Sequence, residues 1–204
     1  FKAYQLIKRE DKYDSQVALP FVIVGSGNAA VEVAFALRKR WINRSLNILC
    51  KSNKIDKKIL KSLFFSNIKL IDKLPLDYGK ILLCTGNEPP LWIKNNCLEL
   101  DIKGRIVTNE QLKLKNFLGI FATGDCAVIG SSKRAASGIF AVKVLNILAN
   151  NIKKDIEGKS LRKWFPQRFG LQIVNSYPRK VSKAFAIYGN LVIGPYFIIW
   201  YIKN

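Results

Sequence analysis

A glycine-rich turn, Gly25-Ser26-Gly27-Asn28-Ala29-Ala30, joins an apolar run to a helical pattern near the start of the chain. The apolar run, residues 17–24, is rich in β-branched side chains and predicts a buried strand centred on residues 21–24. Residues 29–40 repeat apolar side chains at helical spacing and end in a basic turn, and residues 46–50 predict a second strand. This order predicts a β-α-β unit, and such units require a parallel sheet.

The turn carries the G-x-G-x-x-A pattern that dinucleotide-binding folds place between a strand and a helix. Gly25 permits the tight turn, Gly27 lets a pyrophosphate approach the backbone, and the small Ala30 lets helix and strand pack closely. The free N–H groups and positive dipole end of the helix would bind the diphosphate. A glycine turn that only joins strand to helix is the alternative, and it leaves the complete β-α-β context unexplained. The predicted cofactor-binding residues are Gly25, Ser26, Gly27, Asn28 and Ala29.

The end of the second predicted strand, Cys50-Lys51-Ser52, bears on the choice between NADH and NADPH. A carboxylate about 20 residues after the glycines would bond the ribose 2′-OH of NADH, whereas a basic residue tolerates the 2′-phosphate of NADPH. No carboxylate stands at that spacing, so Lys51 and Ser52 are candidate ligands of a phosphate. The alternative is that Lys51 is one more solvated lysine, and the choice of nucleotide stays open.

The rest of the chain continues the alternation of strands and helices. A helix is expected over residues 56–65, and strands over residues 68–71 and 80–84. The alternation predicts an α/β fold with a Rossmann-like, doubly wound domain over residues 1–86, whose β-α-β core is residues 17–50. The remaining predictions are a linker at 10–16, strands at 104–107 and 120–122, a helix at 136–149, a hairpin of 171–174 and 184–188, and an aromatic tail at 191–202.

A second motif, Phe121-Ala122-Thr123-Gly124-Asp125, closes a predicted strand with a glycine and an aspartate. An aspartate at a strand end is often a turn former or a helix cap, but that explains only one residue of the motif. The whole motif resembles the flavin-ribityl motif of two-dinucleotide flavoproteins, the pyridine nucleotide-disulfide oxidoreductase and type II NADH dehydrogenase superfamily. The resemblance implies that Asp125 accepts a hydrogen bond from the ribityl chain of FAD, and that a helix near residues 136–143 points its N-terminus at this cofactor. The implied FAD ligands are Gly124, Asp125, Ser137 and Gly138.

Other segments resemble the same superfamily in the same order. Glu32 matches a glutamate that lies near the nicotinamide ring, and Leu82-Leu83-Cys84-Thr85-Gly86 matches the hinge that returns the chain to the flavin domain, so Gly86 is also a candidate cofactor residue. Three segments are similar to the NADH dehydrogenase-like flavoprotein that some bacteria join to selenide, water dikinase. They are residues 137–143, Phe165-Pro166-Gln167, and Gly194-Pro195 with Trp200.

The resemblance implies a domain order and a chemistry. Residues 1–86 would bind NAD(P)H, residues 87–150 would form the C-terminal part of a second, FAD-binding domain, and residues 151–204 would form a β-hairpin and an aromatic tail. Hydride would pass from nicotinamide to flavin and electrons then to a quinone or another acceptor, with no side chain acting as an acid or a base.

Two departures from the superfamily pattern bear on activity and partners. The N-terminal flavin fingerprint is absent from this sequence, and the connection between residues 71 and 80 is too short for the usual hairpin. We therefore expect the piece to be inactive alone. The expected partners are the missing flavin-binding segment, a selenide, water dikinase domain, a quinone or a membrane surface, and a second copy in a homodimer.

The composition bears on location and on nucleic-acid binding. Lys and Arg total 34 against 14 Asp and Glu, but the basic residues are spread along the chain and no nucleic-acid motif occurs, so a compositional bias is favoured over a nucleic-acid site. The four cysteines lack CxxC spacing and the chain has no histidine, which predicts reduced thiols and no metal site. Without a leader or an apolar run of about 18 residues, we expect a cytoplasmic protein, with the aromatic tail as a candidate peripheral contact to a membrane.

Two rival functions remain open at this stage. A noncatalytic NAD(P)-sensing module that regulates a fused or partner enzyme would fit the missing carboxylate after Cys50 and the short connection before residue 80. A basic adaptor on a membrane or a nucleic acid rests on charge alone and predicts salt-sensitive binding without a nucleotide. Bound flavin would separate the flavoenzyme from the sensor, because a sensor needs none.

Overall fold

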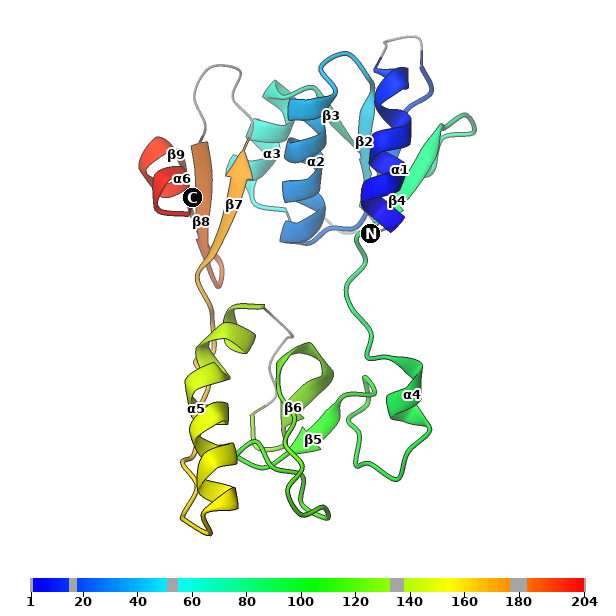
Figure 1. The fold of residues 1–204 in the computed structure, drawn as a ribbon. Helices are drawn as coiled ribbons and strands as arrows, with labels where there is room; N and C mark the ends of the chain where they lie inside the picture. Colours follow the sequence, from blue (N-terminus) through cyan, green and yellow to red (C-terminus); the bar gives the residue numbers. More distant parts are fainter. Residues whose placement is uncertain (1, 15–17, 51–54, 133–137, 177–182, 204) are drawn as a thin grey trace. The chain divides into compact units, whose positions relative to one another are not determined.

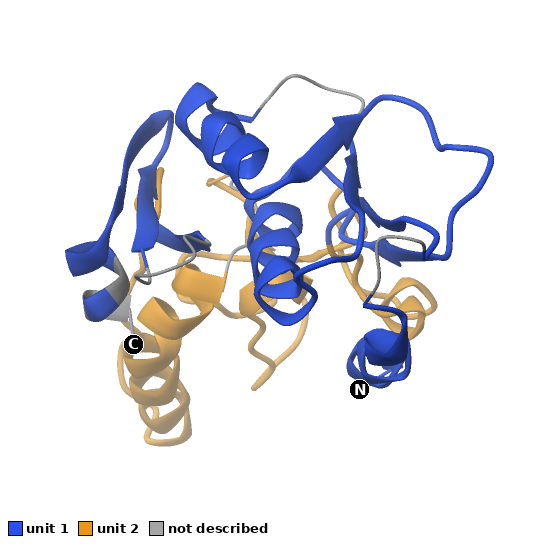
Figure 2. Ribbon diagram, turned by 90° about the horizontal axis from the view of Figure 1, so that it is seen from above, with its two compact units in different colours: residues 1–86, 171–204 blue, residues 87–170 orange. Residues whose placement is uncertain are grey.

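The chain forms two compact units, shown in different colours in Figure 2. The computed structural model describes residues 2–14, 18–50, 55–132, 138–176 and 183–203, with the backbone alone for residues 200, 202 and 203. Unit 1 comprises residues 1–86 and 171–204, and unit 2 comprises residues 87–170. The first change of unit falls at the expected end of the nucleotide-binding domain, at Gly86. The second differs from the expected boundary, because residue 150 lies inside a continuous helix, α5 (Gly138–Ile156).

A parallel four-stranded sheet forms the base of unit 1. Its strands lie in the order β3-β2-β1-β4, so β1 pairs with β2 on one side and with β4 on the other. The chain thus reverses its direction across the sheet after β3, and the carboxyl ends of β1 and β4 flank this switch point, where open α/β sheets bind ligands. The predicted parallel sheet is confirmed. The strands are β1 (Phe21–Val24), β2 (Leu46–Leu49), β3 (Ile68–Ile71) and β4 (Lys80–Leu83).

Two helices connect these strands and bury one face each. Helix α2 (Asn28–Arg40) begins at Gly27 and buries residues at helical spacing, among them Val31 and Phe35. Helix α3 (Lys57–Phe65) begins at Asp56, whose side chain accepts a hydrogen bond from the Lys58 N–H at 2.8 Å.

The C-terminal segment adds a second sheet to unit 1. Strand β7 packs against α2, and Val174, Phe185 and Val192 belong to the same buried cluster as Phe21 and Phe35. Helices α2 and α3 therefore lie between the parallel and the antiparallel sheet (Figure 1). The predicted hairpin is confirmed, and the predicted aromatic tail forms a strand and a short helix. The elements are β7 (Gln172–Ser176), β8 (Lys183–Tyr188), β9 (Leu191–Tyr196) and α6 (Phe197–Lys203).

The prediction of a linker at residues 10–16 is wrong for the part that the structure describes. Helix α1 (Lys2–Glu10) continues into a 3₁₀ turn, η1 (Asp11–Tyr13). Glu10 is buried and forms an ion pair with the equally buried Arg44 at 2.8 Å. The Asp14 carboxylate accepts backbone N–H groups of residues 42, 43 and 44. These polar side chains hold α1 against the loop after α2.

Unit 2 is built around a short parallel pair of strands and one long helix, α5. Helix α5 buries Phe140 and Val144 on one face, and its fully buried Asn151 side chain bonds the carbonyls of Gln111 and Arg162 at 3.0 and 2.8 Å. It thus extends past the predicted end at residue 149. The other elements are α4 (Leu91–Lys94), β5 (Ile106–Thr108), η2 (Gly124–Cys126) and β6 (Ala127–Ile129).

The predicted strand at residues 120–122 is corrected by the structure. Phe121 makes only an isolated antiparallel bridge to Lys113, and the strand that pairs with β5 follows the glycine and aspartate as β6. All three side chains of β6 are buried, whereas Ile120 is exposed and residues 121 and 122 are half-buried, so burial selects the later segment. The strand predicted at residues 104–107 begins at residue 106, because Gly104 lies in a turn with a φ of +75°.

Candidate functional site

The first glycine of the fingerprint lies at the switch point between β1 and β4. The Gly25 N–H donates to the Leu49 carbonyl at 3.1 Å, and the Cys84 N–H donates to the Val24 carbonyl at 2.8 Å. Gly25 has a φ of +149°, and a Cβ placed on it would lie 2.4 Å from the carbonyl oxygen of Cys84. Only glycine fits here, because neighbouring backbone fills the space of a side chain.

The second glycine differs from the first, because no described residue fills the space that a side chain would occupy there. Gly27 has ordinary extended angles, φ −85° and ψ 170°, and starts α2. A Cβ placed on it meets no heavy atom of the described residues within 4 Å. The fold therefore does not require glycine at this position. A ligand that approaches the free N–H groups at the start of α2 would explain it, and Ala30, fully buried behind the turn, completes the pattern.

A cavity of about 320 Å³ lies beside this turn, within unit 1. Ser26 and Asn28 line it from the start of α2, Asp56 from the start of α3, and Asn190 from the turn between β8 and β9. The Asn28 amide donates to the side chain of Gln172 on β7, which fixes the start of α2 to the C-terminal sheet. The cavity thus combines polar groups from three separate parts of the chain.

Sequence reasoning missed three of these polar residues. Asp56 supplies a carboxylate close to the glycine-rich turn of residues 25–30, which is called the phosphate turn below because the fingerprint predicts a phosphate there. Asp56 follows the end of β2 by more residues than the usual spacing. Gln172 and Asn190 come from the far end of the chain, and nothing in their local sequence indicates that they meet the fingerprint. The local sequence at Asp56 indicates only a helix cap, because aspartate is favoured just before the first turn of a helix.

Of the other cofactor-binding residues predicted in unit 1, the structure describes three and leaves two outside its described residues. Ala29 is exposed in the first turn of α2, and Glu32 is half-buried one turn further along. Gly86 is exposed, has a φ of +107°, and is the last residue before unit 2. Lys51 and Ser52 lie outside the described residues, so their proposed contact with a 2′-phosphate remains a prediction.

The second motif forms a turn in unit 2 with unsatisfied buried acceptors. Gly124 has a φ of +78° and starts the 3₁₀ turn that carries Asp125. One carboxylate oxygen of Asp125, Oδ2, accepts a hydrogen bond from Asn87 Nδ2 at 3.0 Å. The other, Oδ1, and Thr123 Oγ1 are buried without a hydrogen-bond partner among the described residues. Buried polar atoms of this kind are costly, so these two atoms mark a place where a donor group is expected.

Helix α5 packs directly on this turn. A Cβ placed on Gly124 would lie 3.8 Å from the Cβ of Ala141, which is in the first turn of α5. Gly138 is exposed as the first residue of the helix, and Ser137 lies outside the described residues. The turn, its aspartate and the start of a long helix thus lie together, as the ribityl interpretation predicts.

The sheet order, the phosphate turn and the start of α2 define unit 1 as a Rossmann-type, dinucleotide-binding fold. No protein-family model matches the chain. A probable NADH dehydrogenase of Dictyostelium discoideum is 32% identical over 87 residues, which are 41% of this chain and 19% of the relative.

Solved structures that share the fold over most of the chain include two flavoprotein-related examples. The HOCl-induced flavoprotein disulfide reductase RclA of Escherichia coli matches 82% of this chain and 41% of its own, with a TM-score of 0.60 and 15% identity. Reduced CoADR-RHD of Bacillus anthracis matches 90% of this chain and 37% of its own, with a TM-score of 0.62 and 18% identity. The predicted resemblance is thus confirmed at the level of the fold, and the chain spans less than half the length of these proteins.

Proposed function

We propose that this chain is part of an FAD-dependent NAD(P)H oxidoreductase, with the nicotinamide nucleotide in unit 1 and the flavin ribityl chain at the Asp125 turn of unit 2. The observation that carries the proposal is the contrast between the two glycines. The fold requires glycine at position 25 but not at position 27, where the space lies open over the helix start. The names of the similar proteins, NADH dehydrogenase and flavoprotein disulfide reductase, support the same class.

In this proposal the chain binds and orients, and bound nicotinamide and flavin would supply the hydride-transfer chemistry. The N–H groups at the start of α2 hold the diphosphate, and Glu32 positions the nicotinamide end. The orphaned Asp125 Oδ1 and Thr123 Oγ1 fit the hydroxyl groups of a ribityl chain, which can donate to both. No side chain of the site has to move a proton.

Two features of unit 2 support the proposal that a further flavin-binding segment packs against it. Its two-stranded sheet is parallel, and parallel strands usually lie in larger sheets that are covered on both faces. Helix α5 exposes apolar side chains on the face that does not pack in unit 2, including Val142 at 68% and Ile156 at 82%. We propose that the missing segment of the FAD domain covers this surface, and that the chain is inactive without it.

The proposal also covers the electron acceptor, the partners and the location. Electrons would go to a quinone or another acceptor, and the selenide, water dikinase partner and the homodimer rest on the sequence resemblance alone. No helix in the described part of the chain is both long and apolar enough to cross a membrane. We propose a cytoplasmic protein in peripheral contact with a membrane through exposed residues of α6 such as Ile198 and Tyr201.

The test is a visible spectrum of the full-length protein that contains this chain, followed by anaerobic addition of NADH and then NADPH. A flavin band that bleaches with either nucleotide is the expected result, and the more effective nucleotide is the donor. A colourless protein that still binds a nicotinamide nucleotide would overturn the oxidoreductase and establish the sensing module. Loss of flavin in Asp125→Ala, with nucleotide binding retained, would place FAD at the Asp125 turn.

A further inference from the structure

A second, larger cavity of about 550 Å³ runs along α3 from its first turn, at Lys58, to its last residue, Phe65, and reaches the last turn of α2 at Arg38. Ile42 and Asn67, in the segments that follow α2 and α3, also line it, and the Gly194-Pro195 bend of β9 forms another wall. This volume falls within the range of about 300–1,000 Å³ that is typical of small-molecule sites. The described residues that line this cavity all belong to unit 1, and none of them also lines the cavity at the phosphate turn.

The lining is cationic. Three basic residues, Arg38, Lys58 and Lys61, border the cavity, and no acidic residue is among the described residues that line it. The ammonium of Lys58 donates to the neutral carbonyl of Val192 at 2.7 Å, and that of Lys61 lies 5.9 Å from the centre of the Phe65 ring. A cavity bordered in this way attracts anions.

Arg38 offsets the partial negative charge that the carboxyl end of α2 would otherwise present to an anion. The carboxyl end of a helix carries partial negative charge, which repels anions. The Arg38 guanidinium donates to the carbonyls of Trp41, Ile42 and Asn67 at 2.9, 3.0 and 2.9 Å. The positive charge of this buried residue therefore lies against carbonyls of the segments that directly follow α2 and α3.

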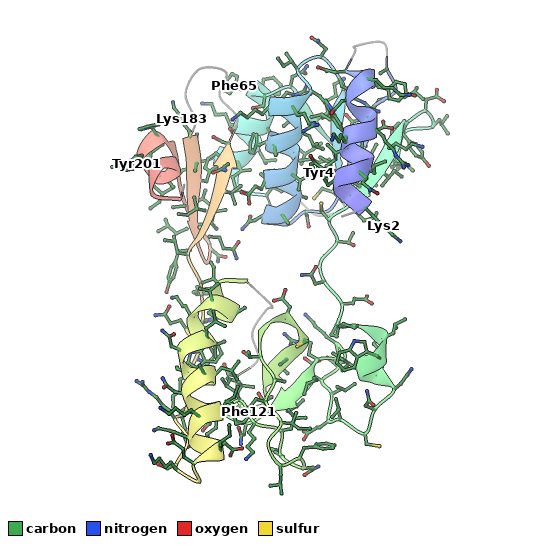
Figure 3. All side chains as sticks on the ribbon, viewed as in Figure 1. Lys2, Tyr4, Phe65, Phe121, Lys183 and Tyr201 are labelled. Carbon is green, nitrogen blue, oxygen red and sulfur yellow. The ribbon has the colours of Figure 1, made fainter. Side chains whose placement is uncertain are left out.

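The rest of the lining is suited to an apolar body. Phe65, labelled in Figure 3, is 71% exposed, and Ile42 is 64% exposed. Both are large apolar side chains that border the cavity while remaining accessible to solvent. Ser62 adds a hydroxyl group next to Lys61, where it can donate to an anion.

We propose that this cavity binds a small amphipathic anion, an aromatic or aliphatic body that carries one carboxylate or sulfonate group. Lys58 and Lys61 bind the acidic group, with Ser62 as a hydroxyl donor. Phe65, Ile42 and Pro195 contact the apolar body. The proposal stands independently of the oxidoreductase, because its residues belong to a different cavity.

Titration of the full chain with 2-naphthoate, followed by NMR, tests this site. We expect shifts of the amide signals of Ser62, Ser66 and Asn67, and binding at least tenfold weaker for 2-naphthalenemethanol, which has the same body without the charge. Lys61→Gln should weaken naphthoate binding about fivefold, whereas Lys57→Gln, an exposed lysine of the same helix outside the cavity, should not change it.

Filling the cavity provides a second test. Ser62→Trp should abolish naphthoate binding and leave NADH binding intact; if this variant does not fold, Lys61→Gln and Lys57→Gln decide. Equal binding of the neutral alcohol, equal effects of the two lysine variants, or shifts confined to other surfaces would overturn the proposal. Failure of NADH binding with normal naphthoate binding would count against the proposed function only.

Discussion

At the scale of single residues, the two fingerprint glycines are expected to be needed for different reasons. The fold requires glycine at position 25, and a bound nucleotide would require it at position 27. Gly25→Ala places a methyl group 2.4 Å from the Cys84 carbonyl oxygen, and we expect a loss of about 2–4 kcal/mol in the free energy of unfolding. Gly27→Ala meets open space, so we expect less than about 1 kcal/mol of destabilisation but at least a tenfold loss of NADH affinity. Urea unfolding and calorimetric titration measure the two quantities.

The result to look for is the difference between the two variants. Gly27→Ala that binds NADH normally would mean that no diphosphate approaches this turn. Gly25→Ala that is as stable as the original chain would mean that the carbonyl of Cys84 can move away, and the steric account of the turn would be wrong.

Asp56 provides a second prediction at this scale, on the choice of nucleotide. Asp56→Asn keeps an oxygen that can cap α3 but removes the negative charge beside the phosphate turn. If the carboxylate bonds the ribose 2′-OH, NADH affinity should fall about threefold to tenfold and NADPH affinity should rise, because the 2′-phosphate is no longer repelled. Titrations with both nucleotides measure this, with the exposed Asp72→Asn as the control for net charge. Equal changes for both nucleotides would assign Asp56 a capping role alone.

At the scale of elements, the attachment of α1 should depend on pH through Asp11. Its pKa is lowered from 3.8 to about 2, chiefly by the hydrogen bond from Arg40. Because the folded pKa lies below the unfolded one, the stabilisation is present above about pH 4 and is lost as the pH falls towards 2. Asp11→Asn should reduce stability at neutral pH by less than about 1 kcal/mol, since the pair is partly exposed.

Urea unfolding at neutral pH, near pH 4 and near pH 2 measures the Asp11 effect. The difference between Asp11→Asn and the original chain should shrink towards zero at the lowest pH. A difference that is the same at all three pH values would show that the side chain acts through its shape and not its charge.

Elements with local signals were predictable, and elements defined by distant partners were not. The strand before Gly25 and the helix after it follow from local periodicity, because burial on one face repeats at a fixed spacing. The choice between residues 120–122 and β6 as the partner of β5 depends on which segment becomes buried, and both are short and apolar. The contact of Asn28 with Gln172 joins residues 144 positions apart, and no local pattern indicates it.

At the scale of the whole molecule, the C-terminal segment is part of unit 1, and this makes the two units separately testable. Phe185 is fully buried against α2 and its neighbours in unit 1, and Val144 is fully buried in unit 2. Phe185→Leu and Val144→Ala should each cost about 1–2 kcal/mol, from lost burial and an incompletely filled cavity. Hydrogen exchange then reports which helices lose protection.

If each unit unfolds on its own, Phe185→Leu should increase exchange in α2 and β1 and leave α5 unchanged, while Val144→Ala should do the reverse. The segment after residue 170 would then stabilise the nucleotide-binding unit, because Val174, Phe185 and Val192 complete its core. Equal loss of protection in both units with either variant would mean that they unfold as one cooperative body. In that case the C-terminal sheet would stabilise the Asp125 turn as well, and variants of the tail would weaken both predicted cofactor sites together.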